Sequence, residues 1–498
     1  MKSHYRMAAI PLLALCVAVP ASAAKPHKHV KPAPGPVIAA NELTAPPPAP
    51  AEKPSLTLAE ALAIAYETNP QLAAQQASLR ATDENVAIAN GGWRPTISAG
   101  GTYAFQQYFF NPVTIAGVGT FSSISGHPVQ TAITVTQPIF RGGRTYAQIG
   151  RAKAQVRAAR AQLIAAEQTV LLSAATSYMD VVRDTQVLRL REHNVQVLQK
   201  QADATQAQFN AGSLTRTDVA QAQARLAGAQ SDLTAAQSQL ASSNANFVQA
   251  IGRVPETLEA DPALPPALPT GVDDSITLAL KQNPAIVQAR ENEIAADYSV
   301  DDAIGAMLPT LSVQGQYGLS QGALVSPLGT LSTTPGGSTS HALTVTGQLN
   351  VPIYQAGVEE ATLRQARELH AQSQFNVTVS DRQVRDAVAV AWAAFEAAEA
   401  SIASNEAAVR ANEIAFEGVS KEQQVGGRTI LDVLNAEQEL LNSSVALVTA
   451  KRTAEVAAFQ VLAAAGALTA QNLGLKVKLY DPLEHYDSDA AAWVGFGD

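Results

Sequence analysis

The chain repeats itself at a fixed offset of 214 positions, and no gap is needed to keep the two copies in register. Asn69-Pro70 recurs as Asn283-Pro284, and Pro95-Thr96 recurs as Pro309-Thr310. The other matched positions are Tyr103 and Tyr317, Pro138-Ile139 and Pro352-Ile353, Gly143 and Gly357, Gly212 and Gly426, Thr215 and Thr429, Asp218-Val219 and Asp432-Val433, and Gly252 and Gly466. A constant register of this length predicts two equivalent structural units, and it constrains the fold more than any local propensity does.

These matches divide the chain into two repeats with flanking segments. The first repeat is expected at 55–260 and the second at 271–474, joined by a Pro-rich connector at 261–270. A Pro/Ala-rich segment at 25–54 precedes them, and such a composition cannot bury enough apolar surface to order itself. A C-terminal tail at 475–498 follows the second repeat. We therefore expect one duplicated unit with a linker ahead of it.

Residues 1–24 have the layout of a secretory signal peptide. Lys2 and Arg6 precede an apolar run, and small residues follow that run up to the expected cleavage site after Ala23 or Ala24. The apolar run is too short to be a good membrane-spanning helix. The sequence therefore predicts an exported protein.

A lipoprotein signal is the alternative, because Cys16 could carry the lipid. Leu15 stands where such signals usually have Gly, Ala or Ser, which favours the ordinary signal peptide. Cys16 is the single cysteine of the chain, so intramolecular disulfides and zinc sites built on several cysteines are excluded. A solvated linker is favoured over metal binding for His27 and His29. We therefore expect no metal and no cofactor.

Each repeat contains a long helical hairpin, expected at 143–252 and 357–466. Apolar residues mark a seam along the first helix of each hairpin, with successive spacings of 7, 11, 7 and 7. The seam residues are Leu163, Val170, Val181, Leu188 and Val195 in the first repeat, and Val377, Val384, Phe395, Ile402 and Val409 in the second. Gly212 and Gly426 are expected to end these first helices. The narrow seam predicts helices that pack side by side with much of their surface in water.

Four segments alternate apolar and polar residues, at about 96–110, 128–140, 310–324 and 341–353. In the third segment, Leu311, Val313 and Tyr317 fall on one face and polar residues fall on the other. Strands of about ten residues with one apolar and one small polar face are typical of transmembrane β-barrels around a water-filled lumen. The Gly/Ser/Pro-rich segments at 111–126 and 326–340 are expected to be their outer loops.

The number of strands predicts an oligomer. One chain supplies four strands, and open sheet edges are not tolerated in hydrocarbon. Closure of the sheet therefore requires several copies of the chain under cyclic symmetry. Three copies would supply 12 strands, which lies within the range of membrane barrels and is wide enough for a channel.

The duplicated turns resemble those of the TolC family of outer-membrane efflux proteins. The resemblance covers about residues 55–474, and it rests on the strand-to-helix turns at 137–143 and 351–357 and the hairpin turns at 209–219 and 425–433. It implies a mixed α and β fold in which a homotrimer forms a 12-stranded outer-membrane β-barrel on a long periplasmic α-helical barrel. It also implies docking to a periplasmic adaptor and to an inner-membrane pump of the RND, ABC or MFS type. The expected function is passive exit from a tripartite efflux or type I secretion system.

The same resemblance implies a gate at the hairpin turns. Arg428 matches the gate arginine, which would pair with Asp218 and Thr217 of a neighbouring hairpin. Asp432 matches a constriction-ring aspartate, and three copies around an axis would attract cations and repel anions. Asn435 stands at the second ring position, where a carboxylate is expected in the family. The alternative interpretation is that Asp218 and Asp432 only cap the helices that follow them.

Other classes of protein fit the sequence less well. A net charge of −9 without a basic block argues against a nucleic-acid partner. No HExxH, P-loop or nucleophile-elbow pattern is present, which argues against an enzyme. A periplasmic adaptor is the stronger alternative because it also carries a helical hairpin, but four lipid-facing strands are not expected in one. Tyr178 and its repeat partner Trp392 are expected to be buried in the core.

Overall fold

The computed structural model describes residues 55–116, 119–262, 265, 268–321, 324–325, 339–489 and 493. The predicted signal peptide with Cys16, the linker at 25–54 and most of the predicted loop at 326–340 lie outside the described residues. The described residues belong to one compact unit, which begins at Pro54.

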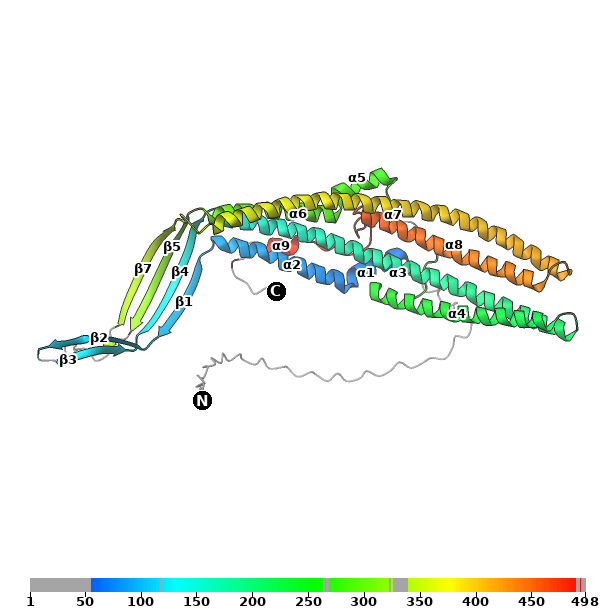
Figure 1. The fold of residues 1–498 in the computed structure, drawn as a ribbon, viewed down its shortest axis with the longest axis horizontal. Helices are drawn as coiled ribbons and strands as arrows, with labels where there is room; N and C mark the ends of the chain where they lie inside the picture. Colours follow the sequence, from blue (N-terminus) through cyan, green and yellow to red (C-terminus); the bar gives the residue numbers. More distant parts are fainter. Residues whose placement is uncertain are drawn as a thin grey trace, which may run out of the picture. The chain divides into compact units, whose positions relative to one another are not determined.

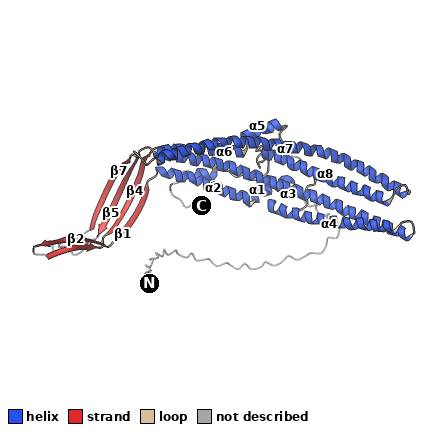
Figure 2. Cartoon of the chain, viewed as in Figure 1, coloured by secondary structure: helices blue, strands red, loops and turns tan. Residues whose placement is uncertain are grey.

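In both halves of this unit two short helices are followed by strands and then by a long helical hairpin, and the first half has the additional helix η1 and one more described strand. The first half consists of α1 (Leu58–Thr68), α2 (Pro70–Asn90), η1 (Gly91–Trp93), β1 (Thr96–Tyr103), β2 (Gln106–Ile115), β3 (Gly119–Gly126), β4 (Val129–Arg141), α3 (Arg144–Asn210) and α4 (Arg216–Ile251). The second half consists of α5 (Val272–Gln282), α6 (Pro284–Ala306), β5 (Thr310–Gln321), β6 (Leu324–Val325), β7 (Thr339–Asn350), α7 (Val358–Gln424) and α8 (Ile430–Ala464), and α9 (Glu484–Asp489) follows it. Figure 1 shows these elements, and Figure 2 shows that the helices and the strands form separate parts of the unit.

The repeated Asn-Pro pairs begin equivalent helices. Asn69 caps α2 and Asn283 caps α6, each with a side-chain oxygen that accepts a hydrogen bond from the second following backbone N–H at 2.9 Å. Proline follows at the first helical position, where its missing N–H costs nothing. The same two side chains donate to Ala250 and Ala464, at 3.2 and 2.8 Å. The repeat therefore extends from the sequence to individual tertiary hydrogen bonds.

The long helices follow the predicted hairpins. α3 and α7 contain 67 residues each, which corresponds to about 100 Å at 1.5 Å per residue. Gly212 and Gly426 follow their ends with φ of 80° and 81°, the left-handed conformation that L-residues disfavour. None of the ten seam residues is exposed. In Figure 1, α4 lies along α3 and α8 lies along α7, with the two turns at the same end of the unit.

Four strands form an antiparallel sheet in the order β1-β4-β5-β7. The register aligns apolar residues in rows across the sheet, such as Ala99, Ile133, Tyr317 and Leu343. Neighbouring rows are polar, such as Ser98, Thr134, Gln316 and Thr344. Residues paired across antiparallel strands share a face of the sheet. The sheet therefore has one apolar face and one polar face, as the alternation predicts.

The outer end of the sheet differs from the prediction. The strand expected at 96–110 is two strands, because β1 ends at Tyr103 and β2 begins at Gln106. The loop expected at 111–126 is wrong as well, since most of it belongs to the antiparallel β2–β3 hairpin. This hairpin and β6 form a second, three-stranded sheet. The Gly and Ser content of the segment suggested a loop, whereas backbone pairing to a neighbouring strand produced a ribbon.

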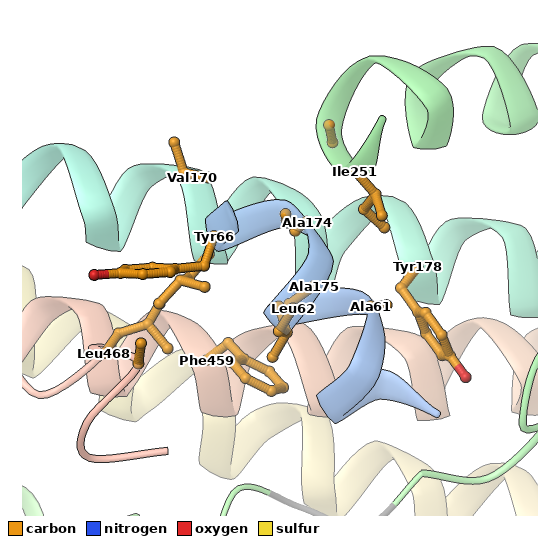
Figure 3. Close-up of a cluster of buried hydrophobic side chains, with 14 of the residues drawn as sticks. Ala61, Leu62, Tyr66, Val170, Ala174, Ala175, Tyr178, Ile251, Phe459 and Leu468 are labelled. Atoms are coloured by element: carbon orange, nitrogen blue, oxygen red, sulfur yellow. The ribbon is translucent and has the colours of Figure 1, made fainter. Parts of the chain in front are cut away.

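The main core lies where the short helices meet the long ones. It joins side chains of α1, α3, α4 and α8, and Figure 3 shows Leu62 of α1 next to Phe459 of α8. Tyr178 is fully buried as predicted, and its hydroxyl donates to the carbonyl of Leu56 at 2.8 Å. Its repeat partner Trp392 is only half-buried, because its indole N–H donates to the surface residue Glu396 at 2.8 Å.

An ion-pair network next to this core connects α3 of the first repeat with α8 of the second. Asp180 of α3 accepts from Arg183 at 3.0 Å and from Arg452 of α8 at 2.9 Å. Asp184 is buried and accepts from Arg183 at 2.7 Å and from Ser243 of α4 at 2.5 Å. Burial alone would raise the pKa of Asp184, but these hydrogen bonds outweigh it and lower the pKa. Asp180 therefore links α3 to α8, and Asp184 links α3 to α4.

Candidate functional site

The first hairpin turn is built by a helix end, a glycine and a new helix cap. α3 ends at Asn210, and Gly212 reverses the chain. Thr215 then caps α4 through a reciprocal pair of bonds with Asp218. The Asp218 carboxylate accepts from the Thr215 backbone N–H at 2.9 Å and from its hydroxyl at 2.7 Å. Thr217 lies exposed in the first turn of α4.

The second hairpin turn repeats this construction. Thr429 caps α8, and the Asp432 carboxylate accepts from its backbone N–H at 3.0 Å and from its hydroxyl at 2.8 Å. The hydrogen bonds from Thr429 lower the pKa of Asp432, and those from Thr215 lower the pKa of Asp218. Both carboxylates therefore cap helices, as the alternative interpretation predicts, and both stay charged at neutral pH.

Arg428 has a partner that the sequence did not suggest. Its Nε lies 2.8 Å from Glu422 Oε2 across the same turn, and both side chains are about half exposed. The hydrogen bond to Glu422 raises the pKa of Arg428, and the charges of Glu422 and Asp432 add to this effect. Within one chain, Arg428 thus pairs with Glu422, while Asp218 is engaged in its own cap. Opposite charges at each end of a glycine turn are the signal that could have revealed this pair.

The two hairpins contact each other close to their turns. Asn435 of α8 accepts a hydrogen bond from Arg225 of α4, with 3.1 Å between Nη2 and Oδ1. Below it, apolar residues from both hairpins pack together, namely Leu198, Ala229, Ile430 and Leu434 with Val195, Leu214 and Leu226 around them. The candidate ring residue Asn435 is therefore fixed by the neighbouring hairpin, a contact that sequence spacing does not reveal.

Glu437 is a buried acid near the same turns. It lies on α8 with 8% of its surface exposed. Burial raises the pKa of Glu437 to about 7. An isolated carboxylate in an apolar setting is neutral more easily than it is charged, which is the physical cause of this rise. Sequence analysis missed this residue because a glutamate in a polar helix has no distinguishing pattern.

Metal-ligating residues do not gather in the described part of the chain. No group of three or more His, Cys, Asp or Glu side chains that could hold a metal ion occurs among the described residues. The candidate site consists of the charged and polar side chains at the two turns, which include Asp218, Arg428 and Asp432.

A comparison with known families identifies the duplicated unit. The model of the family described as "Outer membrane efflux protein" matches residues 61–253 and again residues 275–467. The chain belongs to this outer membrane efflux protein family. The two matches are 214 positions apart, so each repeat of the efflux protein is one copy of the family unit.

Individual relatives agree with the family. The chain is 36% identical to the outer membrane efflux protein BepC of Brucella suis over 441 residues, which is 89% of this chain and 92% of that protein. It is 25% identical to the outer membrane protein TolC of Escherichia coli, over 84% of this chain and 85% of that protein. The crystal structure of the Campylobacter jejuni CmeC outer membrane channel has the same fold, with a TM-score of 0.72 at 16% identity over 87% of this chain and 89% of that chain.

These findings confirm several sequence-based predictions. The efflux protein has the TolC-like fold with two repeats, and it is an outer-membrane channel with a periplasmic portion. It is not an enzyme, and the adaptor alternative is excluded because the family consists of outer-membrane channels.

Proposed function

We propose that this efflux protein is the passive exit duct of a tripartite efflux or secretion system and acts as a homotrimer. The observation that carries the proposal is the sheet β1-β4-β5-β7, in which β1 and β7 are paired on one side only. An outer-membrane protein cannot leave these edges open to lipid. Pairing β1 of one chain with β7 of the next would close a 12-stranded barrel from three copies.

The two faces of the sheet support a barrel around water. The rows that contain Ile97, Ile133 and Leu343 leave large apolar side chains exposed, at 72%, 51% and 75%. The alternate rows carry Ser, Thr and Gln. An apolar exterior and a polar lumen are the arrangement that a water-filled membrane barrel requires.

A second apolar face on α7 supports packing between chains. Val384, Val388 and Phe395 bury one side of α7 within the chain. Phe375 and Val379 lie on the opposite side, because nine residues at 100° per residue separate Phe375 from Val384. Both are exposed, at 71% and 48%. Among the described helices, α7 contains a stretch apolar enough to cross a membrane by length and composition, and only 17% of that stretch is buried. Contact with a neighbouring chain would cover this face.

The hairpin turns would form the gate of the duct. Arg428 lies exposed at a turn and already forms one ion pair, with Glu422. In a ring of hairpins it would also reach Asp218 and Thr217 of a neighbour. Asp432 would contribute one carboxylate per chain to a constriction, with Asn435 as its neutral second position. Docking of a periplasmic adaptor and an inner-membrane pump of the RND, ABC or MFS type would spread the turns, and the pump would supply the energy.

The oligomeric state is tested by native mass spectrometry of the detergent-extracted protein. The expected mass is three times that of the mature chain, and the trimer should stay intact when the detergent is exchanged. A monomer that needs no detergent would contradict both the trimer and the barrel.

The gate is tested by single-channel conductance in planar bilayers. Arg428→Ala is expected to raise a small, cation-selective conductance, because one of the links that hold the turns closed is lost. Arg410→Ala is the matched control, since Arg410 is an exposed α7 arginine that pairs with Glu406 at 3.8 Å, away from the turn. If the two variants conduct equally, the protein can still be a duct, but Arg428 has no role in a gate.

A further inference from the structure

The C-terminal segment runs along α2 toward the sheet. Its start is fixed where Tyr480 donates its backbone N–H to the Tyr66 hydroxyl at 3.2 Å. Helix α9 then packs against α2, as Figure 1 shows. Trp493, further along, lies under Arg94, with 5.0 Å between the guanidinium carbon and the ring centroid. Arg94 lies two residues before β1, so the contacts of residues 480–489 and of Trp493 extend from the core to the junction of helices and strands.

The middle of this segment is held by contacts of three kinds. Tyr486 packs on an apolar cluster of Val86, Ala152 and Val156. Its ring also lies 5.0 Å from the guanidinium of Arg160, a distance that suits a cation–π contact. His485 lies near Asp83, a carboxylate with 2% of its surface exposed. Burial raises the pKa of Asp83, and the charges of Arg160 and His485 oppose that rise. The segment is therefore a strap with specific anchor points.

The end of the strap presents aromatic surface at a position where a membrane boundary is expected. Trp493 is 70% exposed, and Trp93, which precedes Arg94, is 48% exposed. The Trp93 carbonyl accepts from Gln137 of β4 at 2.9 Å, which fixes it to the sheet. β5 and β7 contain 12 residues each, about the length of a tilted strand that spans the hydrocarbon core. The ends of the strands therefore coincide with the level of the lipid headgroups.

Other exposed aromatic residues lie at the same junctions. They are Phe140 at the end of β4, Tyr146 in the first turn of α3 and Tyr354 between β7 and α7, with exposures of 45%, 70% and 78%. Tryptophan and tyrosine prefer the membrane interface, because their rings are apolar while their N–H and O–H groups stay hydrated. An arginine beside them can bind a lipid phosphate.

We propose that residues 480–489 act as a strap along α2 and that Trp493 lies at the phospholipid headgroups of the periplasmic leaflet, where Trp493 and Trp93 anchor the channel in the membrane. A lipid surface is the occupant that fits best, because the apolar face of the sheet ends at this junction and the exposed rings continue it. This inference rests on the proposed barrel, and the experiment below separates the two.

The chain contains three tryptophans, which allows each to be tested alone. Variants that keep only Trp93, Trp392 or Trp493, with the other two replaced by phenylalanine, are reconstituted in phosphatidylcholine vesicles. The acyl chains carry bromine either near the headgroup or near the chain end, and bromine quenches tryptophan on contact. Trp93 and Trp493 are expected to lose more of their emission to the shallow bromine than to the deep bromine. Trp392, half-buried on α7, is the matched control and should be unaffected.

One further variant decides what a negative result means. Val345→Trp, made in a background without other tryptophans, reports on the apolar face of β7 and should be quenched most by the deep bromine. If Val345→Trp is unquenched, the proposed barrel itself is wrong. If Val345→Trp is quenched while Trp493 behaves like Trp392, the barrel stands and the anchor is overturned. The same conclusion holds if Trp493 is also inaccessible to the aqueous quencher iodide, because another protein chain and not lipid then covers it.

The role of the strap is tested by removing the contacts that Tyr486 makes at its middle. Tyr486→Ala, combined with Trp493 as the single tryptophan, removes the contacts with Val86 and Arg160. Quenching of Trp493 by the shallow bromine is then expected to fall toward the level of Trp392. Unchanged quenching would show that the strap does not position Trp493, and it would overturn that part of the inference.

Discussion

At the scale of single residues, Asp432 caps α8 in the structure, and a second role in a constriction ring is proposed for it. Asp432 satisfies backbone and side-chain donors of Thr429, and this alone accounts for an acid in the first turn of a helix. The same bonds lower the pKa of Asp432, so it stays charged until the pH falls well below its usual range. Its stabilising effect on the turn is present at neutral pH and is lost as the pH falls through this lowered pKa. A permanently charged cap is also suited to a ring that attracts cations.

Two substitutions separate the cap from the ring. Thr429→Val removes the capping hydroxyl but keeps the charge of Asp432, so faster amide hydrogen exchange at 429–434 is expected with little change in ion selectivity. Asp432→Asn removes the charge, and a lower cation selectivity is expected in the reversal potential of reconstituted channels. Asp218→Asn is the control in the other repeat. If Asp432→Asn leaves selectivity unchanged, Asp432 is a cap alone.

Glu437 predicts an unusual pH dependence of stability. Its folded-state pKa of about 7 lies above the ordinary value of 4.5. The folded state therefore binds a proton more tightly than the unfolded state, and stability falls as the pH rises from about 4.5 to about 7. The shift corresponds to at most about 3 kcal/mol. Glu437→Gln is expected to raise the melting temperature at pH 8 and to change it little at pH 4, as scanning calorimetry can measure. Equal effects at both pH values would contradict the burial argument.

At the scale of elements, each hairpin depends on one glycine that ends its first helix. Gly426 has a φ of 81°, and no atom lies within 4 Å of the position that a Cβ would occupy. Position 426 therefore requires glycine because of its backbone conformation and not because a side chain would clash. Local stereochemistry, which the sequence specifies directly, thus decides where a helix of 67 residues stops.

Two glycine-to-alanine substitutions, with opposite expected effects on the free energy of unfolding, test this. Gly426→Ala forces an L-residue into the left-handed region, and a loss of about 1 kcal/mol is expected. Gly418→Ala lies inside α7, where a Cβ also meets nothing, and a gain of about 0.5–1 kcal/mol is expected because alanine is the better helix former. Denaturant or thermal unfolding of the two variants shows whether each substitution raises or lowers the free energy of unfolding. A stabilising effect of Gly426→Ala would contradict the argument from backbone conformation.

At the scale of the whole molecule, the proposed trimer rests on two features of the single chain. The sheet has two edge strands, and α7 has a second, exposed apolar face. Phe375→Asp is expected to weaken the proposed trimer, because it places a charge on that face without touching the core of its own chain. Asn376→Asp adds the same charge at the neighbouring exposed position and is expected to have a smaller effect. Native mass spectrometry at rising temperature measures both, and equal trimer stability would place the interface elsewhere.

Much of this fold follows from local rules that act within a few residues. Asn-Pro pairs start helices, glycines end them, and strict alternation identifies strands, so the repeat, the hairpins and the two-faced sheet could be predicted. The outer β2–β3 hairpin could not, because Gly- and Ser-rich segments form loops or strands depending on whether a neighbouring strand is available for pairing.

The duplicated architecture, the turns of the two long hairpins and the capping role of Asp218 and Asp432 could be predicted from the chain alone, since they depend on backbone conformation and periodicity. The folded chain was needed to show that Arg428 pairs with Glu422, that Asn435 binds Arg225, that Glu437 is buried and that α9 packs along α2. Such contacts cannot be predicted locally because the interactions are short-ranged in space but join residues that are distant in sequence. Hydrogen bonds, ion pairs and burial act over a few ångströms between elements that can be hundreds of residues apart, and no local pattern encodes which of them come together.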